Sequence, residues 1–282
     1  MPIENVAIIG AGQMGAGIAQ VAAKQGKQVT LHDVKEELVE RGKERIAKAL
    51  GKEVGKERIT EEEKEEVLSR IHPTINFEEA ADADIVIEAA SENTQIKKKI
   101  FQDLDRLTGK ETILATNTSS ISITELAALT GRPEKVIGMH FFNPVPVMKL
   151  VEVIRGLTTD DHTFTEVRAL AEELGKEPVD ISDYPGFAAN RILVPMVNEA
   201  IYCVYEGVAS PEDVDKVMKL GANHPLGPLA LADLIGLDTC LSIMEVLHDG
   251  FGDSKYRPCP LLYKYVNAGW LGRKTGRGFF SY

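Results

Sequence analysis

The chain has 282 residues, 44% of them hydrophobic and 27% charged, which is the composition of an ordinary globular protein with room for two domains. Its formal net charge of -11 argues against generic binding to nucleic acid or to an anionic membrane, because both need a cationic surface. The three cysteines, Cys203, Cys240 and Cys259, lie far apart and form no CxxC motif, which predicts reduced thiols.

The N-terminal segment MPIENVAIIG enters a strand-like pattern directly and lacks the features of a signal peptide, so we expect a cytoplasmic protein without a membrane span. Helix-like stretches separate most of a series of apolar, strand-like runs at residues 6–9, 28–31, 85–88, 112–115 and 136–141. This alternation predicts an α/β fold with a Rossmann-type doubly wound, mostly parallel sheet. The charged segment 35–71 is too long for one crossover helix, and we expect it to form a helical hairpin insertion.

The strand signals weaken near Val179, and a Pro-Gly pair in the segment DISDYPGFAANRIL precedes sequence with helical periodicity. We therefore place a domain boundary near Asp183, with a Rossmann-type α/β domain at residues 1–183 and an all-helical domain at residues 184–282. Helices are expected at residues 189–205, 211–220, 230–247 and 260–267. Their apolar surface predicts packing against a second subunit in a homodimer.

Three glycines, Gly10, Gly12 and Gly15, form a G-x-G-x-x-G motif between a predicted strand and a predicted helix. They permit a tight turn and a close approach of the backbone to a pyrophosphate at the helix N-terminus, although the same pattern can be a plain turn. Asp33 ends the next strand, eighteen residues beyond Gly15. A carboxylate there accepts hydrogen bonds from a ribose diol and repels a 2′-phosphate, so the two features together predict an NAD site.

His140 stands at the end of a predicted strand in the segment VIGMHFFNPVPVMKLVEVI, at a sheet edge where ligands collect. The run 149–154 follows through a loop too short for a crossover helix, so an antiparallel hairpin centred near Pro146 would bring Glu152 opposite His140. An imidazole oriented by a carboxylate is suited to take a proton from a hydroxyl. A core histidine beside a partly exposed glutamate is the alternative interpretation.

Two other polar positions have two interpretations each, and metal chemistry has no support. Ser119, in the segment ATNTSSISI, can hold a substrate oxygen or cap the following helix. The same ambiguity holds for Asn190 near the start of the second domain. Because the histidines, cysteines and carboxylates do not show the spacing of a metal site, we expect no metal.

Six segments together resemble the (S)-3-hydroxyacyl-CoA dehydrogenase family over essentially the whole chain: GAGQMGAGIAQ, ATNTSSISITELA, GMHFFNPVPVMKLVEVI, DYPGFAANRIL, GANHPLGPLALADLIGLD and GRKTGRGFFSY. The resemblance implies an oxidoreductase that uses NAD to interconvert short-chain (S)-3-hydroxyacyl-CoA and 3-ketoacyl-CoA, with (S)-3-hydroxybutyryl-CoA and acetoacetyl-CoA as the expected pair. It also implies that His140 is the general acid/base, that Glu152 orients it, and that Ser119 and Asn190 contact the substrate.

The motif and the resemblance together define the expected ligand contacts. The cofactor contacts are expected at Gly10, Gly12, Gln13, Met14, Gly15, Asp33, Glu92, Lys97, Asn117, Ser119, Asn143 and Lys274. The resemblance places the charged hairpin near the CoA, where Lys48, Lys52 and Lys56 recur four residues apart. On one continuous helix these three would present ammonium groups to CoA phosphates on a single face. A solvated face, or a helix broken at an intervening glycine, is the alternative.

Two other classes of function stay open at this point. A sugar-acid dehydrogenase of the same superfamily would keep the NAD site and the His-Glu pair but would not depend on CoA. A non-catalytic structural protein that binds NAD would lack useful turnover. The intact set of His140, Glu152, Ser119 and Asn190 argues against the structural protein, and the lysines of the hairpin argue against the sugar-acid enzyme.

Overall fold

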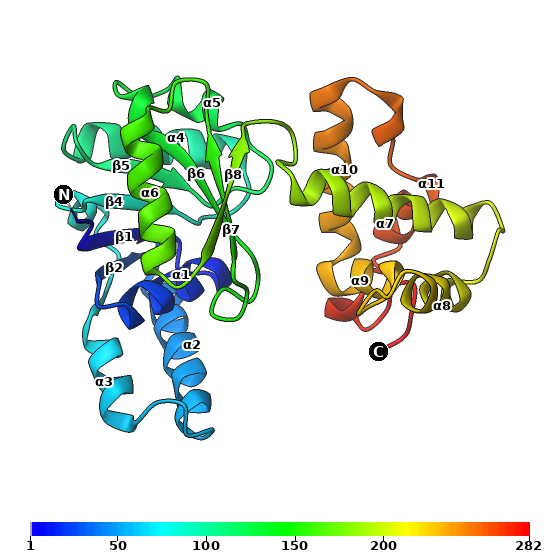
Figure 1. The fold of residues 1–282 in the computed structure, drawn as a ribbon, viewed down its shortest axis with the longest axis horizontal. Coiled ribbons are helices and arrows are strands. Elements are labelled where there is room, and N and C mark those ends of the chain that lie inside the picture. The colour runs from blue at the N-terminus through cyan, green and yellow to red at the C-terminus, as the bar shows by residue number, and fades with distance from the viewer. Residues whose placement is uncertain (1) are drawn as a thin grey trace. The chain divides into compact units, whose positions relative to one another are not determined.

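The computed structural model describes residues 2–282. The chain divides after Asp183 into two compact units, residues 1–183 and 184–282. The first unit contains an eight-stranded sheet with helices on both of its faces, and the second unit is helical (Figure 1). The predicted fold class, a doubly wound, mostly parallel α/β sheet with a helical insertion and a helical C-terminal part, is confirmed.

The sheet has the strand order β3-β2-β1-β4-β5-β6-β7-β8. Its strands are β1 (Asn5–Ile9), β2 (Gln28–His32), β3 (Ile71–Thr74), β4 (Ile85–Glu88), β5 (Ile113–Thr116), β6 (Val136–Phe141), β7 (Leu150–Arg155) and β8 (Glu177–Ser182). Neighbouring strands run parallel, except that β6 and β7 are antiparallel. Strands β4, β5 and β6 are buried along their whole length, as expected for parallel strands that are covered on both faces.

Two strands of this sheet, β3 and β8, have no counterpart among the predicted runs. Both lie at the edges of the sheet. Strand β3 has only four residues, one of which is Pro73, and β8 is mostly exposed or half-buried. Edge strands bury little side-chain surface, so their sequences do not show the apolar run that marks a central strand.

The first unit contains α1 (Gln13–Lys24), α2 (Glu36–Val54), α3 (Glu61–Ser69), α4 (Thr94–Leu107), α5 (Ile123–Ala127) and α6 (Asp161–Glu173), with short 3₁₀ turns η1 (Phe77–Ala80) and η2 (Pro133–Lys135). The expected helical hairpin is confirmed as α2 and α3, and Figure 1 shows it extending away from the sheet. A capping box starts α3, because the Thr60 side chain accepts from the Glu63 amide and Glu63 accepts from the Thr60 amide.

The second unit contains α7 (Ala189–Tyr205), α8 (Pro211–Gly221), α9 (Pro228–Ile235), α10 (Leu237–Phe251) and α11 (Pro260–Asn267), with 3₁₀ turns η3 (Ser254–Tyr256) and η4 (Arg273–Thr275). The prediction of one helix over residues 230–247 is wrong. Gly236 has a φ of 103°, which a helix cannot contain, and the chain turns there between α9 and α10. The apolar spacing continues through this turn because both helices bury their residues in the same core.

Two features of residues 2–282 bear on the broad functional class. None of the helices found there has the length and apolar composition needed to cross a membrane. Within the same range, no group of three or more His, Cys, Asp or Glu side chains is arranged to hold a metal ion. Cys240 and Cys259 are buried and Cys203 is half-buried, and all three are free thiols.

Candidate active site

The glycine turn between β1 and α1 is shaped by two tight backbone contacts. Gly10 has a φ of 111°, and a Cβ there would lie 2.5 Å from the carbonyl oxygen of Ala89. A Cβ on Gly15 would lie 1.8 Å from the carbonyl oxygen of Gly10. Only glycine is therefore compatible with the turn at these two positions.

Gly12 differs from the other two glycines because its Cβ position is open. Among the described residues, no neighbouring atom lies within 4 Å of that position. Gly12 is the N-cap of α1, and no side chain caps this helix end. The first amide groups of α1 are thus available to an anion, and the open face of Gly12 lets a pyrophosphate approach them closely. The turn fits the diphosphate of a dinucleotide.

Asp33 lies directly beside this turn, after the end of β2. Its Oδ2 accepts a hydrogen bond from the amide of Ala11 at 2.8 Å, and its Oδ1 accepts one from the amide of Val34 at 2.7 Å. The side chain is half-buried. Each carboxylate oxygen retains a further lone pair, so Asp33 can accept hydrogen bonds from ribose hydroxyls while it holds the turn in place.

His140 and Glu152 face each other across the antiparallel strands β6 and β7. The strand register pairs the two residues directly, as the predicted hairpin requires. His140 Nδ1 lies 2.8 Å from Glu152 Oε2, and the two residues are 7% and 2% exposed. Because a carboxylate only accepts hydrogen bonds, Nδ1 carries the hydrogen and Nε2 carries the lone pair of the neutral imidazole. The arrangement orients a base.

Two asparagines connect the neighbouring loops to this pair and to the glycine turn. Asn117, just after β5, accepts a hydrogen bond from the amide of Phe141 through its Oδ1 at 2.8 Å. Asn143, in the loop after β6, accepts one from Gln13 Nε2 at 2.8 Å. Asn117 is therefore fixed at the end of the strand that carries His140, and Asn143 is fixed beside the start of α1.

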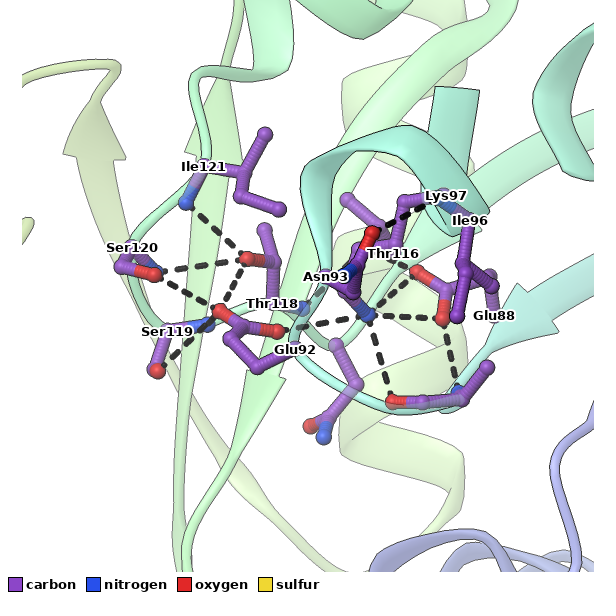
Figure 2. Close-up of polar contacts among 12 residues, drawn as sticks. Glu88, Glu92, Asn93, Ile96, Lys97, Thr116, Thr118, Ser119, Ser120 and Ile121 are labelled. Atoms are coloured by element: carbon purple, nitrogen blue, oxygen red, sulfur yellow. Dashed lines mark hydrogen bonds and ion pairs between the residues drawn. The ribbon is translucent and has the colours of Figure 1, made fainter. Parts of the chain in front are cut away.

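Ser119 lies in a loop that is held by Glu92 (Figure 2). Glu92 Oε1 accepts hydrogen bonds from the Ser119 amide at 2.9 Å, from Thr118 Oγ1 at 2.5 Å and from Ser120 Oγ at 2.8 Å. The Ser119 hydroxyl lies 3.3 Å from the same oxygen. The N-cap of α5 is Ser122, so the interpretation of Ser119 as that helix cap is wrong.

Burial alone would raise the pKa of the Glu92 carboxyl. The nearby ammonium of Lys97 and the hydrogen bonds from the 118–120 loop outweigh that effect, so the pKa of Glu92 lies below its ordinary value. The carboxylate form is therefore the one that holds the loop.

Asn190 and Lys274, which the sequence also marks as site residues, belong to the second unit. Asn190 is the second residue of α7 and is half-buried. Lys274 lies in η4, and its Nζ donates to Asp238 Oδ2 at 2.6 Å. Their predicted contacts with substrate and cofactor stay predictions.

Two family models cover the chain almost end to end. The model described as the NAD binding domain of 3-hydroxyacyl-CoA dehydrogenase matches residues 5–184, and the model described as its C-terminal domain matches residues 186–282. The chain belongs to the 3-hydroxyacyl-CoA dehydrogenase family. The predicted resemblance is confirmed, the chain is an NAD-dependent dehydrogenase, and NAD is its cofactor.

Known relatives resemble the chain along its whole length. A "Probable 3-hydroxybutyryl-CoA dehydrogenase" of Bacillus subtilis is 62% identical over 282 residues, which cover 100% of this chain and 98% of that protein. The mitochondrial hydroxyacyl-coenzyme A dehydrogenase of Homo sapiens is 43% identical over 288 residues, which cover 99% of this chain and 91% of that protein. The crystal structure of an (S)-3-hydroxybutyryl-CoA dehydrogenase from Ralstonia eutropha has a TM-score of 0.97 and 53% identity, covering 99% of each chain.

The structure of this 3-hydroxyacyl-CoA dehydrogenase corrects the expected lysine row on the hairpin. Lys48 and Lys52 are exposed and lie four residues apart on α2, but α2 ends at Val54 and Lys56 is in the following turn. The prediction that three ammonium groups lie on one helix face is therefore wrong. Gly51 is helical, and the helix stops only before Gly55.

Lys97 is placed differently from what a direct cofactor contact would suggest. Its side chain is 1% exposed, and its Nζ lies 2.7 Å from Glu88 Oε1 and 3.3 Å from Glu92 Oε2. Lys97 is thus connected to the Ser119 loop through Glu92. Glu88 itself was missed by sequence reasoning, although one signal marks it: it is the only charged residue in the strand IVIE, whose other residues are all apolar.

Proposed function

We propose that this enzyme interconverts (S)-3-hydroxybutyryl-CoA and acetoacetyl-CoA by hydride transfer between C3 of the acyl group and NAD. The observation that carries the proposal is the buried His140–Glu152 pair at 2.8 Å, in a family whose members with similar chains are named for this reaction. An alcohol loses a hydride only if its hydroxyl proton is taken, and an oriented imidazole provides the base.

In this proposal the residues of the chain do the following. His140 Nε2 takes the proton of the 3-hydroxyl during oxidation and returns it during reduction. Glu152 accepts the Nδ1–H bond and stabilises the imidazolium that forms. Ser119 and Asn190 hold the substrate oxygens, and the glycine turn and Asp33 hold the dinucleotide. NAD, when bound, supplies the hydride acceptor.

The CoA end and the subunit contact are part of the same proposal. Lys48 and Lys52 are exposed on α2, and Lys56 on the turn that follows, where they can meet the phosphates of CoA. For the homodimer, the second unit carries exposed apolar side chains, among them Ile192, Val208, Val217 and Leu220. A cavity of about 390 Å³ with almost wholly apolar walls lies among α7, α8 and α9. Such apolar surface favours pairing with a second copy of the chain. We place this homodimer in the cytoplasm.

The test follows the oxidation of NADH by the purified protein with acetoacetyl-CoA, with free acetoacetate and with a longer 3-ketoacyl-CoA. We expect fast turnover with acetoacetyl-CoA and little with free acetoacetate. Turnover of only the longer thioester would replace the butyryl substrate by a longer chain. NADH binding without turnover of any thioester would favour a sugar-acid dehydrogenase or a non-catalytic NAD-binding protein.

A further inference from the structure

The Glu88 carboxylate is an ion in the interior of the first unit. It ends β4, it is 0% exposed, and each of its oxygens is fully engaged. Its Oε1 accepts from Lys97 Nζ at 2.7 Å and from the Ala90 amide at 2.7 Å, and its Oε2 accepts from Lys97 Nζ at 2.8 Å and from Thr116 Oγ1 at 2.8 Å. A charge is held in the interior only when it is paired and hydrogen-bonded in this way.

Lys97 joins this interior charge to the carboxylate of Glu92 (Figure 2). It lies in the first turn of α4, which starts where Asn93 Oδ1 accepts from the amides of Gln95 and Ile96. Its ammonium is close to both Glu88 oxygens and more distant, at 3.3 Å, from Glu92 Oε2. The two carboxylates therefore share one ammonium unequally, and Glu88 has the larger share.

The unequal sharing decides what Glu92 can do. Glu92 turns Oε2 toward Lys97 and Oε1 toward the loop of residues 118–120. Its side chain is 39% exposed, so packing alone does not hold it. Without the negative charge of Glu88, Lys97 would have Glu92 as its nearest anion and would draw that carboxylate inward, away from the Ser119 amide.

Stability gives no sufficient reason for this pair. Taking two charges out of water often costs more free energy than their mutual attraction returns, and apolar pairs of the same shape are frequently as stable. What a buried, fully hydrogen-bonded ion pair provides instead is a fixed geometry. That geometry leads here to the hydroxyl proposed to contact the substrate.

We propose that Glu88 is a positioning residue, which holds Lys97 so that the Glu92 carboxylate stays on the 118–120 loop and fixes the place of Ser119. This inference rests on the proposed function for its effect on the reaction. Its structural part, the position of Glu92 and Ser119, is independent of the substrate.

The test compares three variants of the whole enzyme in the acetoacetyl-CoA assay. In Glu88→Gln the shape and the hydrogen-bond acceptor remain but the charge is lost, and we expect kcat/KM to fall by about tenfold or more, as displacements near 1 Å in a site do. The double variant Glu88→Gln with Lys97→Met removes the unpaired ammonium and should recover thermal stability. Its kcat/KM should recover at least in part, because no ammonium is left to draw Glu92 away from the 118–120 loop.

A matched control is Arg132→Met, which removes another buried cation at the opposite end of α4, where Arg132 donates to the carbonyl oxygens of Leu104 and Asp105. It should lower stability and leave kcat/KM near that of the wild type. A purely structural role for Glu88 predicts that folded Glu88→Gln, like Arg132→Met, keeps a kcat/KM near that of the wild type, which would overturn the proposal.

Crystal structures of the wild type and of Glu88→Gln separate this proposal from the proposed function. The expected result is that Glu92 Oε1 leaves the Ser119 amide in the variant. If it keeps that hydrogen bond, the positioning role is refuted, whether or not the wild type reduces a thioester. If the wild type reduces none, the proposed function fails, and the displacement of Glu92 alone decides the role of Glu88.

Discussion

Individual polar side chains in the first unit are held by partners that fix their position. Glu152 fixes the ring of His140, Asp33 is bound to the glycine turn through Ala11, and Glu92 collects three donors from one loop. The His140–Glu152 pairing follows from the sequence because a short loop between two apolar runs sets an antiparallel register. The Glu88–Lys97 pair does not, because local sequence gives no register between a strand end and the following helix.

Replacing His140 by Gln is expected to lower turnover by about 10²- to 10⁴-fold, which is the usual contribution of a positioned acid/base. The Kd of NADH should change little, since the histidine is not part of the glycine turn. Steady-state kinetics with acetoacetyl-CoA and a fluorescence titration of NADH measure the two quantities. His162→Gln is the matched control, because His162 is an exposed surface residue of α6. Equal turnover in both variants would exclude His140 from the mechanism.

The lowered pKa of Glu92 gives stability a defined pH dependence. A carboxyl whose folded pKa lies below its ordinary value of 4.5 stabilises the fold above that pH, and this contribution disappears as the pH falls through the folded pKa. Glu92→Gln lacks it. Denaturant unfolding without cofactor should therefore show the wild type more stable than the variant near neutral pH, with a difference that shrinks as the pH falls below 4.5. A difference independent of pH would contradict the assignment.

At the scale of elements, the sequence predicts central strands well and edges poorly. The predicted bounds of β4, β6, α7 and α11 agree with the structure, because each has a continuous apolar pattern and clear end signals. The turn at Gly236 was hidden inside such a pattern. The end of α2 was marked only by Gly55, and the sequence could not tell this glycine from Gly51, which lies inside the helix. Tertiary packing, which local sequence does not contain, determines where these helices end.

The glycine turn allows a matched pair of substitutions. Gly15→Ala would place a methyl group 1.8 Å from the Gly10 oxygen, so we expect the first unit to unfold or to be strongly destabilised. Gly12→Ala has open space and should fold normally, but its methyl group would occupy the surface where we expect the pyrophosphate to lie, so NADH binding should weaken. Thermal denaturation and NADH titration distinguish the two effects. Normal NADH affinity in Gly12→Ala would place the pyrophosphate elsewhere.

For the whole molecule, the net charge of -11 means that an anionic CoA thioester must meet local positive charge, and we propose that the lysines of the α2–α3 hairpin supply it. The composition predicted that a local basic patch is needed. It did not show that, of Lys48, Lys52 and Lys56, only the first two lie on the same helix. The apolar side chains left exposed on the second unit are the basis of the proposed pairing with a second copy.

The proposed homodimer can be tested with Val217→Glu and Leu220→Glu, both on exposed positions of α8. A buried unpaired carboxylate strongly disfavours association, so we expect the double variant to sediment as a monomer where the wild type sediments as a dimer. Leu157→Glu serves as the control, since Leu157 is an exposed apolar residue of the first unit. A wild type that sediments as a monomer, or a variant that remains dimeric, would argue against this contact surface.

The reversed direction of β7 also has a consequence for the order in which the protein folds. The hairpin joins His140 to Glu152 over twelve residues, whereas β1 and β4 pair Val6 with Ile85. Closing a short loop costs less chain entropy than closing a long one, and hairpins form within about 1–10 μs. The amides of β6 and β7 should therefore gain protection in pulsed hydrogen exchange before those of β1. The His140–Glu152 pair would then assemble before the glycine turn that follows β1.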